Sequence, residues 1–149
     1  MKYLLILFIV AVALAPLSHF MPSKRQRKTA RLREYAAVHG LFVEFRSLPG
    51  VSGGQRDAAG QDTIYYGRRL PASRQKGAST QAWLRDGEAW RPLERSYGIP
   101  AVLGQMPQQV LAASADENSC GAYWRESGEV DEVQQICQAL EAWSAQLRE

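Results

Sequence analysis

Residues 81–91 read Gln-Ala-Trp-Leu-Arg-Asp-Gly-Glu-Ala-Trp-Arg, the strongest local fold signal in the chain. Asp86-Gly87 is a favoured hairpin turn, because glycine tolerates positive φ and aspartate tolerates the left-handed region. With that turn, the residues that face each other across two antiparallel strands are Arg85 and Glu88, Leu84 and Ala89, and Trp83 and Trp90. The tryptophan pair either supports the hairpin or forms a platform for a ligand.

More strands are expected on both sides of this hairpin. Residues 41–46 are rich in β-formers, with polar residues entering at period two, and further strands are expected at 63–70, 109–115 and 120–126. The last two would form a second hairpin around residues 116–118, although a helix is an alternative for 108–115 because Gln, Leu and Ala favour it. Residues 98–107 have the composition of a loop.

The C-terminal segment predicts an amphipathic helix. Its apolar residues recur at helical spacing, at Val130, Val133, Ile136, Cys137, Leu140, Trp143 and Leu147. One apolar stripe suits packing on a sheet, so the predicted fold class is α+β: a small antiparallel sheet closed by a C-terminal helix. The order of elements suggests a pleckstrin-homology-like barrel as one form of that sheet.

The N-terminal segment predicts a transmembrane helix. From Tyr3 to Ser23 there is no charged residue, and this length matches the hydrocarbon thickness of a bilayer. A cleaved secretory signal is the alternative, but Pro16 directly after Ala13-Leu14-Ala15 makes a poor cleavage site. The expected organisation is an anchor at 1–23, a basic juxtamembrane helix at 24–40 and an α+β domain at 41–149.

The basic residues of the chain are concentrated after this apolar segment. The chain has 18 basic and 15 acidic residues, yet residues 24–34 carry a net charge of +5 and residues 35–149 carry −3. The topology-determining set is Lys24, Arg25, Arg27, Lys28, Arg31 and Arg33. Positive charge on the C-terminal flank predicts a single-pass protein of the inner (cytoplasmic) membrane with its domain in the cytoplasm. Four of these residues share a helical stripe that could also contact anionic lipid.

The helix that carries these charges has recognisable ends. Ser23 and Gln26 have capping-box spacing, and Gly40 supplies a stop, so a helix is expected from about Ser23 to Val38. A domain charge of −3 gives no reason to expect nucleic acid as a partner. The expected partners are the lipid bilayer and a membrane-protein partner.

A second group of residues could form a surface for that partner. The loop at 72–80 and the end of the preceding strand bring together basic side chains, which either contact an acidic partner or are simply solvated. Together with the aromatic hairpin, the candidate partner surface comprises Arg68, Arg69, Arg74, Lys76, Trp83 and Trp90.

The sequence predicts no catalytic residue, no metal site and no cofactor. His19 lies in the apolar segment and His39 stands alone at a helix end, so neither belongs to a metal-binding cluster or a recognisable nucleophile–base pair. Phosphate-loop, nucleotide and Cys-x-x-Cys motifs are missing. Cys120 and Cys137 are expected to be free thiols in a reducing cytoplasm, whereas a periplasmic domain could join them. The chain is therefore expected not to be an enzyme.

Residues 1–38 resemble YajC-type accessory subunits of the bacterial Sec translocase. The resemblance rests on the apolar run from Tyr3 to Met21 and on Pro-Ser-Lys-Arg-Gln-Arg-Lys-Thr-Ala-Arg-Leu-Arg at 22–33. It implies one membrane span, a basic helix and a small cytoplasmic β-rich domain. The glycine-rich run that follows the basic helix in that family is replaced here by residues 41–46. The expected function is a non-catalytic protein-interaction or accessory subunit; the alternatives are a module that binds anionic lipid or a YajC-like translocase accessory protein.

Overall fold

A computed structural model describes residues 1–50, 63–71 and 79–149. The chain divides into two compact units, Met1–Ala30 and Arg31–Glu149. The described residues of the second unit form a six-stranded sheet and a C-terminal helix, which confirms the α+β class.

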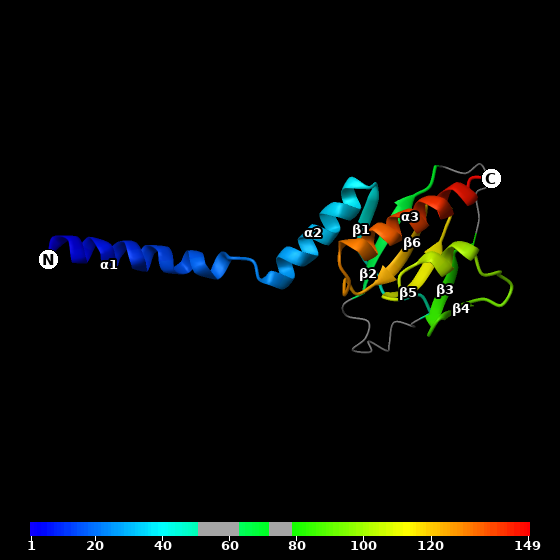
Figure 1. Cartoon of the computed structure of the whole chain (residues 1–149), viewed down its shortest axis with the longest axis horizontal. Helices are drawn as coiled ribbons and strands as arrows, with labels where there is room; N and C mark the ends of the chain where they lie inside the picture. The colour runs from blue at the N-terminus through cyan, green and yellow to red at the C-terminus, as the bar shows by residue number, and fades with distance from the viewer. Residues whose placement is uncertain (51–62, 72–78) are drawn as a thin grey trace. The chain divides into compact units, whose positions relative to one another are not determined.

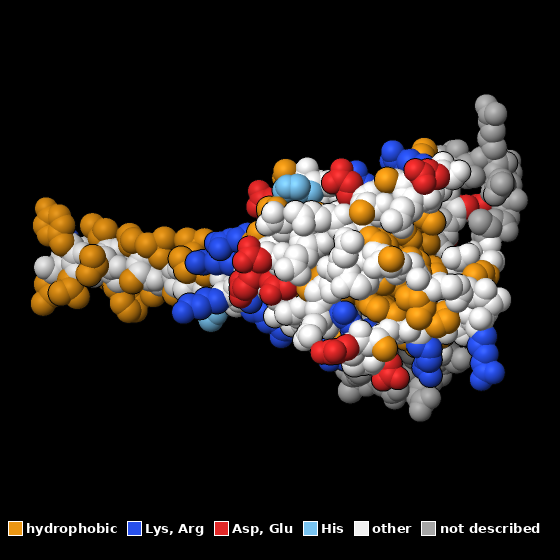
Figure 2. Space-filling view, turned by 45° about the vertical axis from the view of Figure 1, so that its right-hand side comes forward, with side chains coloured by type: hydrophobic (Ala, Val, Ile, Leu, Met, Phe, Trp, Pro, Cys, Tyr) orange, Lys and Arg blue, Asp and Glu red, His pale blue; other side chains and the backbone are white. Residues whose placement is uncertain are grey.

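The first unit begins with helix α1 (Lys2–Leu14), which continues as the 3-10 helix η1 (Ala15–Phe20). The change of helix type coincides with Pro16, which lacks the amide donor that an α-helix needs. Lys2–Phe20 is long and apolar enough to cross a membrane, and none of its residues is buried. Hydrophobic side chains cover this helix along its length in Figure 2. The helical part ends at Phe20, before the expected limit at Ser23.

Helix α2 (Lys24–Val38) has the expected ends. The backbone amide of Ser23 donates to Gln26 Oε1 at 2.9 Å, and the amide of Gln26 donates to Ser23 Oγ at 3.2 Å, so the capping box is confirmed. Gly40 has φ +81°, a conformation that ends the helix at little steric cost. Leu32 and Ala36 are buried, so the C-terminal half of α2 is part of the domain.

One antiparallel sheet forms the centre of the domain. Its strands are β1 (Leu41–Phe45), β2 (Ile64–Arg69), β3 (Gln81–Asp86), β4 (Ala89–Pro92), β5 (Val110–Ala115) and β6 (Ser119–Trp124). The order across the sheet is β1-β2-β6-β5-β3-β4 (Figure 1). The hairpin β5–β6 is confirmed and the helical alternative for 108–115 is wrong. The barrel analogy is also wrong, because β1 and β4 are opposite edges of an open sheet.

Helix α3 (Val130–Gln146) packs on one face of this sheet (Figure 1). The Glu129 and Glu132 side chains form a capping box at its start. Trp143 meets Trp83 of β3 edge to face, with ring centroids 5.5 Å apart. The residues expected to be a loop at 98–107 include a 3-10 helix, η2 (Ala101–Gln105), whose Val102 and Leu103 are buried.

The β3–β4 hairpin has a different register from the one expected. Asp86 pairs with Ala89, so the turn residues are Gly87 and Glu88, and Trp83 lies opposite Pro92. Gly87 has φ +63° and Glu88 does not have positive φ, as in a type II′ turn. The predicted Trp83–Trp90 pair is therefore wrong. Trp90 lies opposite Arg85, whose guanidinium carbon is 4.9 Å from the Trp90 ring centroid.

Candidate functional site

A row of aromatic rings crosses the face of the sheet opposite α3. Phe42, Tyr65 and Tyr123 lie on neighbouring strands, with centroid distances of 5.8 Å and 4.8 Å between successive rings. Two glycines on this face make room for them. A Cβ at Gly121 would lie 2.3 Å from Tyr65 Cζ, and a Cβ at Gly67 would lie 2.4 Å from Tyr65 Cε1. The Tyr65 ring therefore lies flat against the backbone of the sheet.

The segment that follows β1 covers this aromatic row. The Arg46 guanidinium carbon is 4.1 Å from the Tyr65 centroid, Leu48 packs on the same apolar cluster, and Gly50 closely approaches Leu93 beyond β4. Residues 46–50 thus cross the sheet face from the β1 edge towards the β4 edge. This explains how Tyr65 is fully buried on a face that no described helix covers.

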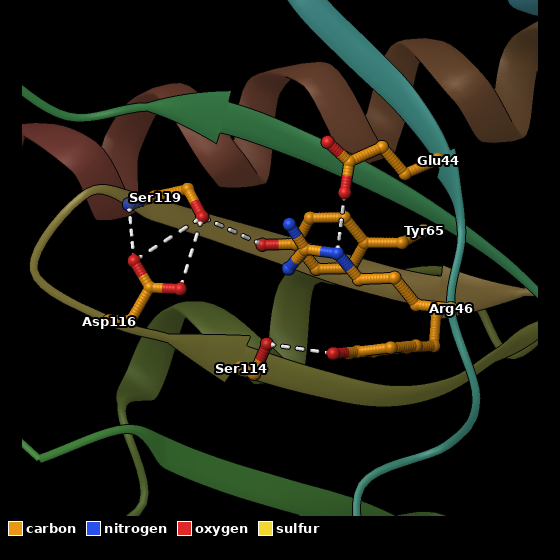
Figure 3. Close-up of polar contacts among 7 residues, drawn as sticks. Glu44, Arg46, Tyr65, Ser114, Asp116 and Ser119 are labelled. Carbon is orange, nitrogen blue, oxygen red and sulfur yellow. Dashed lines mark hydrogen bonds and ion pairs between the residues drawn. The ribbon is translucent and has the colours of Figure 1, made fainter.

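Hydroxyl groups around the aromatic row form a hydrogen-bonded cluster (Figure 3). Tyr65 Oη lies 3.3 Å from Ser119 Oγ, and Tyr123 Oη lies 3.2 Å from Ser114 Oγ. Asp116 accepts hydrogen bonds from the backbone amides of Asn118 and Ser119 at 2.7 and 2.8 Å, as in an Asx turn of the β5–β6 hairpin.

The chemistry of this cluster suits structure better than catalysis. Burial raises the pKa of Tyr65 to about 12, so the phenol stays neutral near pH 7. Asp116 is engaged by backbone amides, and the cluster includes neither histidine nor lysine to serve as a base. The hydrogen bonds satisfy buried hydroxyl groups and hold the Tyr65 ring in place.

Arginine and aromatic side chains meet on both faces of β1. We call Arg33, Phe42, Phe45, Arg46 and Arg69 the arginine–aromatic surface. On the face opposite α3, the guanidinium carbons of Arg46 and Arg69 lie 6.0 and 5.3 Å from the ring centroid of Phe42. On the other face, the Arg33 guanidinium carbon is 5.4 Å from the ring centroid of Phe45, which is 78% exposed. Stacking on a ring restricts the motion of each guanidinium group.

Arg33 also contacts a carboxylate that follows β6. Its Nε and Nη2 donate to the two carboxylate oxygens of Glu126 at 2.7 and 2.9 Å, and Tyr66 Oη donates to Glu126 Oε1 at 2.8 Å. The Glu126 side chain is only 7% exposed, and its hydrogen bond raises the pKa of Arg33. Arg33 therefore fastens α2 to Glu126, two residues after the end of β6.

The other predicted membrane-surface residues remain accessible. Lys24, Arg25, Arg27, Lys28 and Arg31 are all exposed on α2. In the predicted partner surface, Arg69 is exposed and Arg68 is half-buried, whereas Arg74 and Lys76 lie outside the described residues. Trp83 and Trp90 are buried, so they belong to the core and cannot form a surface platform.

No known protein family matches this chain, and no curated protein matches it. Among solved structures, the crystal structure of the mycobacterial trehalose monomycolate transport factor A is similar, with a TM-score of 0.47 and 12% sequence identity. The match covers 80% of this chain and 93% of that chain. A likeness at this score and identity implies nothing about activity.

Both thiols of the domain are protonated near neutral pH. Burial raises the pKa of Cys120 to about 12 and that of Cys137 to about 11, so both thiols are neutral and poorly nucleophilic near pH 7. The structure describes both cysteines as buried and free. Within the described ranges no group of three or more His, Cys, Asp or Glu side chains could hold a metal ion.

Phe42, Arg46 and Glu126 were not predicted as site residues. The alternation at 41–46 places Phe42 and Glu44 on one face and Phe45 on the other, which is a usable signal for side-chain direction. No local pattern could have shown that Arg33 pairs with Glu126, because 93 positions separate them.

Proposed function

We propose that this chain is a single-span, membrane-anchored accessory protein whose α+β domain lies in the cytoplasm and binds a protein partner without catalysing a reaction. The observation that carries the proposal is Phe45, a large apolar side chain that is mostly exposed on an edge strand, with the Arg33 guanidinium over its ring. Exposed aromatic and arginine side chains are typical of the central residues of protein interfaces. The apolar helix Lys2–Phe20 supports the anchor, and the basic residues after it favour the cytoplasmic orientation.

The test is site-specific photo-crosslinking in living cells. A photoreactive phenylalanine analogue at position 45 replaces an exposed ring, so the core is left intact. The matched control places the same analogue at Gln138, an exposed position on α3. We expect a reproducible crosslinked protein at position 45 and a much weaker product at position 138. Failure to crosslink any protein from these or other exposed positions would contradict the proposal. The YajC-like N-terminus makes the Sec translocase the first complex to look for in the product.

A second function is favoured by the exposed basic residues of α2. Lys24, Arg27, Lys28 and Arg31 follow the candidate membrane span at spacings of three, one and three, on one helical stripe. Each basic group near an anionic surface contributes about 1 kcal/mol of attraction. We therefore propose that α2 also contacts anionic phospholipid headgroups.

Amine labelling tests this lipid contact. The full chain is placed in nanodiscs of neutral phosphatidylcholine or of the same lipid mixed with phosphatidylserine. Labelling of Lys24 and Lys28 should slow in the anionic discs, and added salt should remove the difference. Equal labelling rates in both discs would eliminate lipid binding and leave α2 with a role in topology alone.

A further inference from the structure

The two edges of the sheet differ in their ability to accept another strand. β4 contains Pro92, which has no backbone amide to donate, whereas β1 contains no proline. In the described part of the chain β1 pairs with β2 alone, so its outer backbone groups are unpaired. An unpaired edge is a template for an incoming extended segment.

The two faces of β1 offer different chemistry to such a segment. On the face opposite α3, Arg46 pairs with Glu44 through Nε at 2.7 Å, and the described residues give its terminal amino groups no partner. Arg69 has no ion-pair partner among the described residues and stacks on Phe42. With Glu44 counted, Arg46 and Arg69 of β2 leave this face a net charge of +1, and the Arg69 guanidinium and the terminal amino groups of Arg46 are suited to carboxylates.

The other face of β1 is apolar at the same edge. Phe45 is exposed there, and Arg33 beside it is already neutralised by its two-point contact with Glu126. An incoming strand alternates its side chains between the two faces. Its residues on one side would meet Arg46 and Arg69, and those on the other side would meet Phe45.

We propose that the β1 edge binds an extended segment of a partner protein in which acidic and apolar residues alternate. The segment adds a strand beside β1, places its carboxylates near Arg46 and Arg69, and packs its apolar side chains against Phe45. The proposal rests on the proposed function and names the partner's chemistry. A second copy of this chain fits less well, because its β1 would bring arginines against arginines.

Peptide binding to the full chain in phosphatidylcholine nanodiscs tests the proposal. The probe is a short fluorescent peptide in which Glu and Val alternate, and binding is followed by anisotropy. One control has the same composition in separate Glu and Val blocks, and a second replaces Glu by Lys. A third is N-methylated at alternate residues, which removes donors for strand pairing. We expect each control to bind at least about tenfold more weakly than the probe.

Variants of the protein locate the binding site. Arg69→Gln and Phe45→Thr change exposed side chains and should each weaken binding about two- to fivefold, the effect of a single surface contact. Arg46→Gln should do the same, although it also removes the contact with Tyr65. The matched control is Arg91→Gln, an exposed arginine on the opposite edge, and it should bind the probe as the parent does.

Four outcomes would overturn the proposal: no binding of the probe, equal binding of the block or N-methylated peptide, equal weakening by Arg91→Gln, or self-crosslinking of the chain through position 45. The last would identify a second copy as the occupant. Capture of a partner at position 45 without peptide binding would remove this inference and leave the proposed function. Peptide binding without any captured partner would support the β1 edge as a binding site and would contradict the proposed function.

Discussion

Gly121→Ala tests how closely the Tyr65 ring lies on the sheet. The added Cβ would stand 2.3 Å from Tyr65 Cζ, where ordinary contacts are 3.4–4 Å, so the ring must move away by about 1 Å. The Arg46 guanidinium lies over the opposite face of the Tyr65 ring, and the Tyr65 hydroxyl contacts Ser119. Overpacking and the loss of the arginine contact should together lower the free energy of unfolding by about 2–4 kcal/mol.

Urea unfolding of the full chain in detergent micelles measures this change. All four tryptophans of the chain lie in the domain, so their fluorescence reports on it without interference from the N-terminal helix. Gly104→Ala is the matched control, because a Cβ there meets no atom within 4 Å. The control should shift the free energy of unfolding by no more than about 0.5 kcal/mol.

A third variant separates this mechanism from a general effect on the strand. In a Tyr65→Leu background the flat ring is gone, so adding Gly121→Ala should cost less than about 1 kcal/mol. An undiminished cost in that background would show that the alanine disturbs something other than Tyr65. Equal stability of Gly121→Ala and Gly104→Ala would refute the close contact itself.

The remaining predictions concern the α2 contact, the thiols and the orientation of the domain. Glu126→Ala should lower the free energy of unfolding by about 2–4 kcal/mol, because it leaves the partly buried Arg33 guanidinium and the Tyr66 hydroxyl without their acceptor. If the effects of Glu126→Ala and Arg33→Met on that free energy are additive in a double-mutant cycle, the two residues are not coupled. Cys120 and Cys137 should react with thiol reagents only when the domain unfolds, and rapid labelling of the native chain would contradict their burial. Because burial raises both thiol pKa values, their contribution to stability is present below pH 9 and is lost as the pH rises towards 11 and 12, so the urea midpoint should fall over that interval. A reporter active only in the cytoplasm should work when fused to Glu149, and activity of a periplasmic reporter there would reverse the orientation.

Local sequence signals were sufficient to predict elements that depend on contacts between neighbouring residues in the chain. The capping box at Ser23 and Gln26 marks the start of α2, and the spacing of apolar residues from Val130 to Leu147 identifies α3. Both depend on contacts within one or two helical turns. The predicted ends of the β-strands were also close to the observed ends, because composition and turn residues mark them locally.

The register of the β3–β4 hairpin shows where a local signal becomes ambiguous. Asp86-Gly87 and Gly87-Glu88 can each form a two-residue turn, with glycine second in one and first in the other. The structure adopts the latter, which places Arg85 over Trp90. The same guanidinium donates to the carbonyl oxygens of Met106 and Val110, each at 3.4 Å. These acceptors lie more than twenty positions away, so the turn sequence alone does not distinguish the two registers.

Composition and short-range periodicity determine much of this protein, so the amino-acid sequence alone is sufficient to predict it. This part comprises the apolar N-terminal helix, the basic segment after it, and the positions of the main helices and strands. The sequence alone does not determine the order of the strands or the arginine–aromatic surface. Periodicity shows which side chains share a face of one strand but not which strand lies beside it. Pairing of β2 with β6 places Tyr65 beside Tyr123, and the folded chain brings Arg33 to Glu126. Such contacts form only when distant segments bury apolar surface together and thereby offset the entropy of closing long loops.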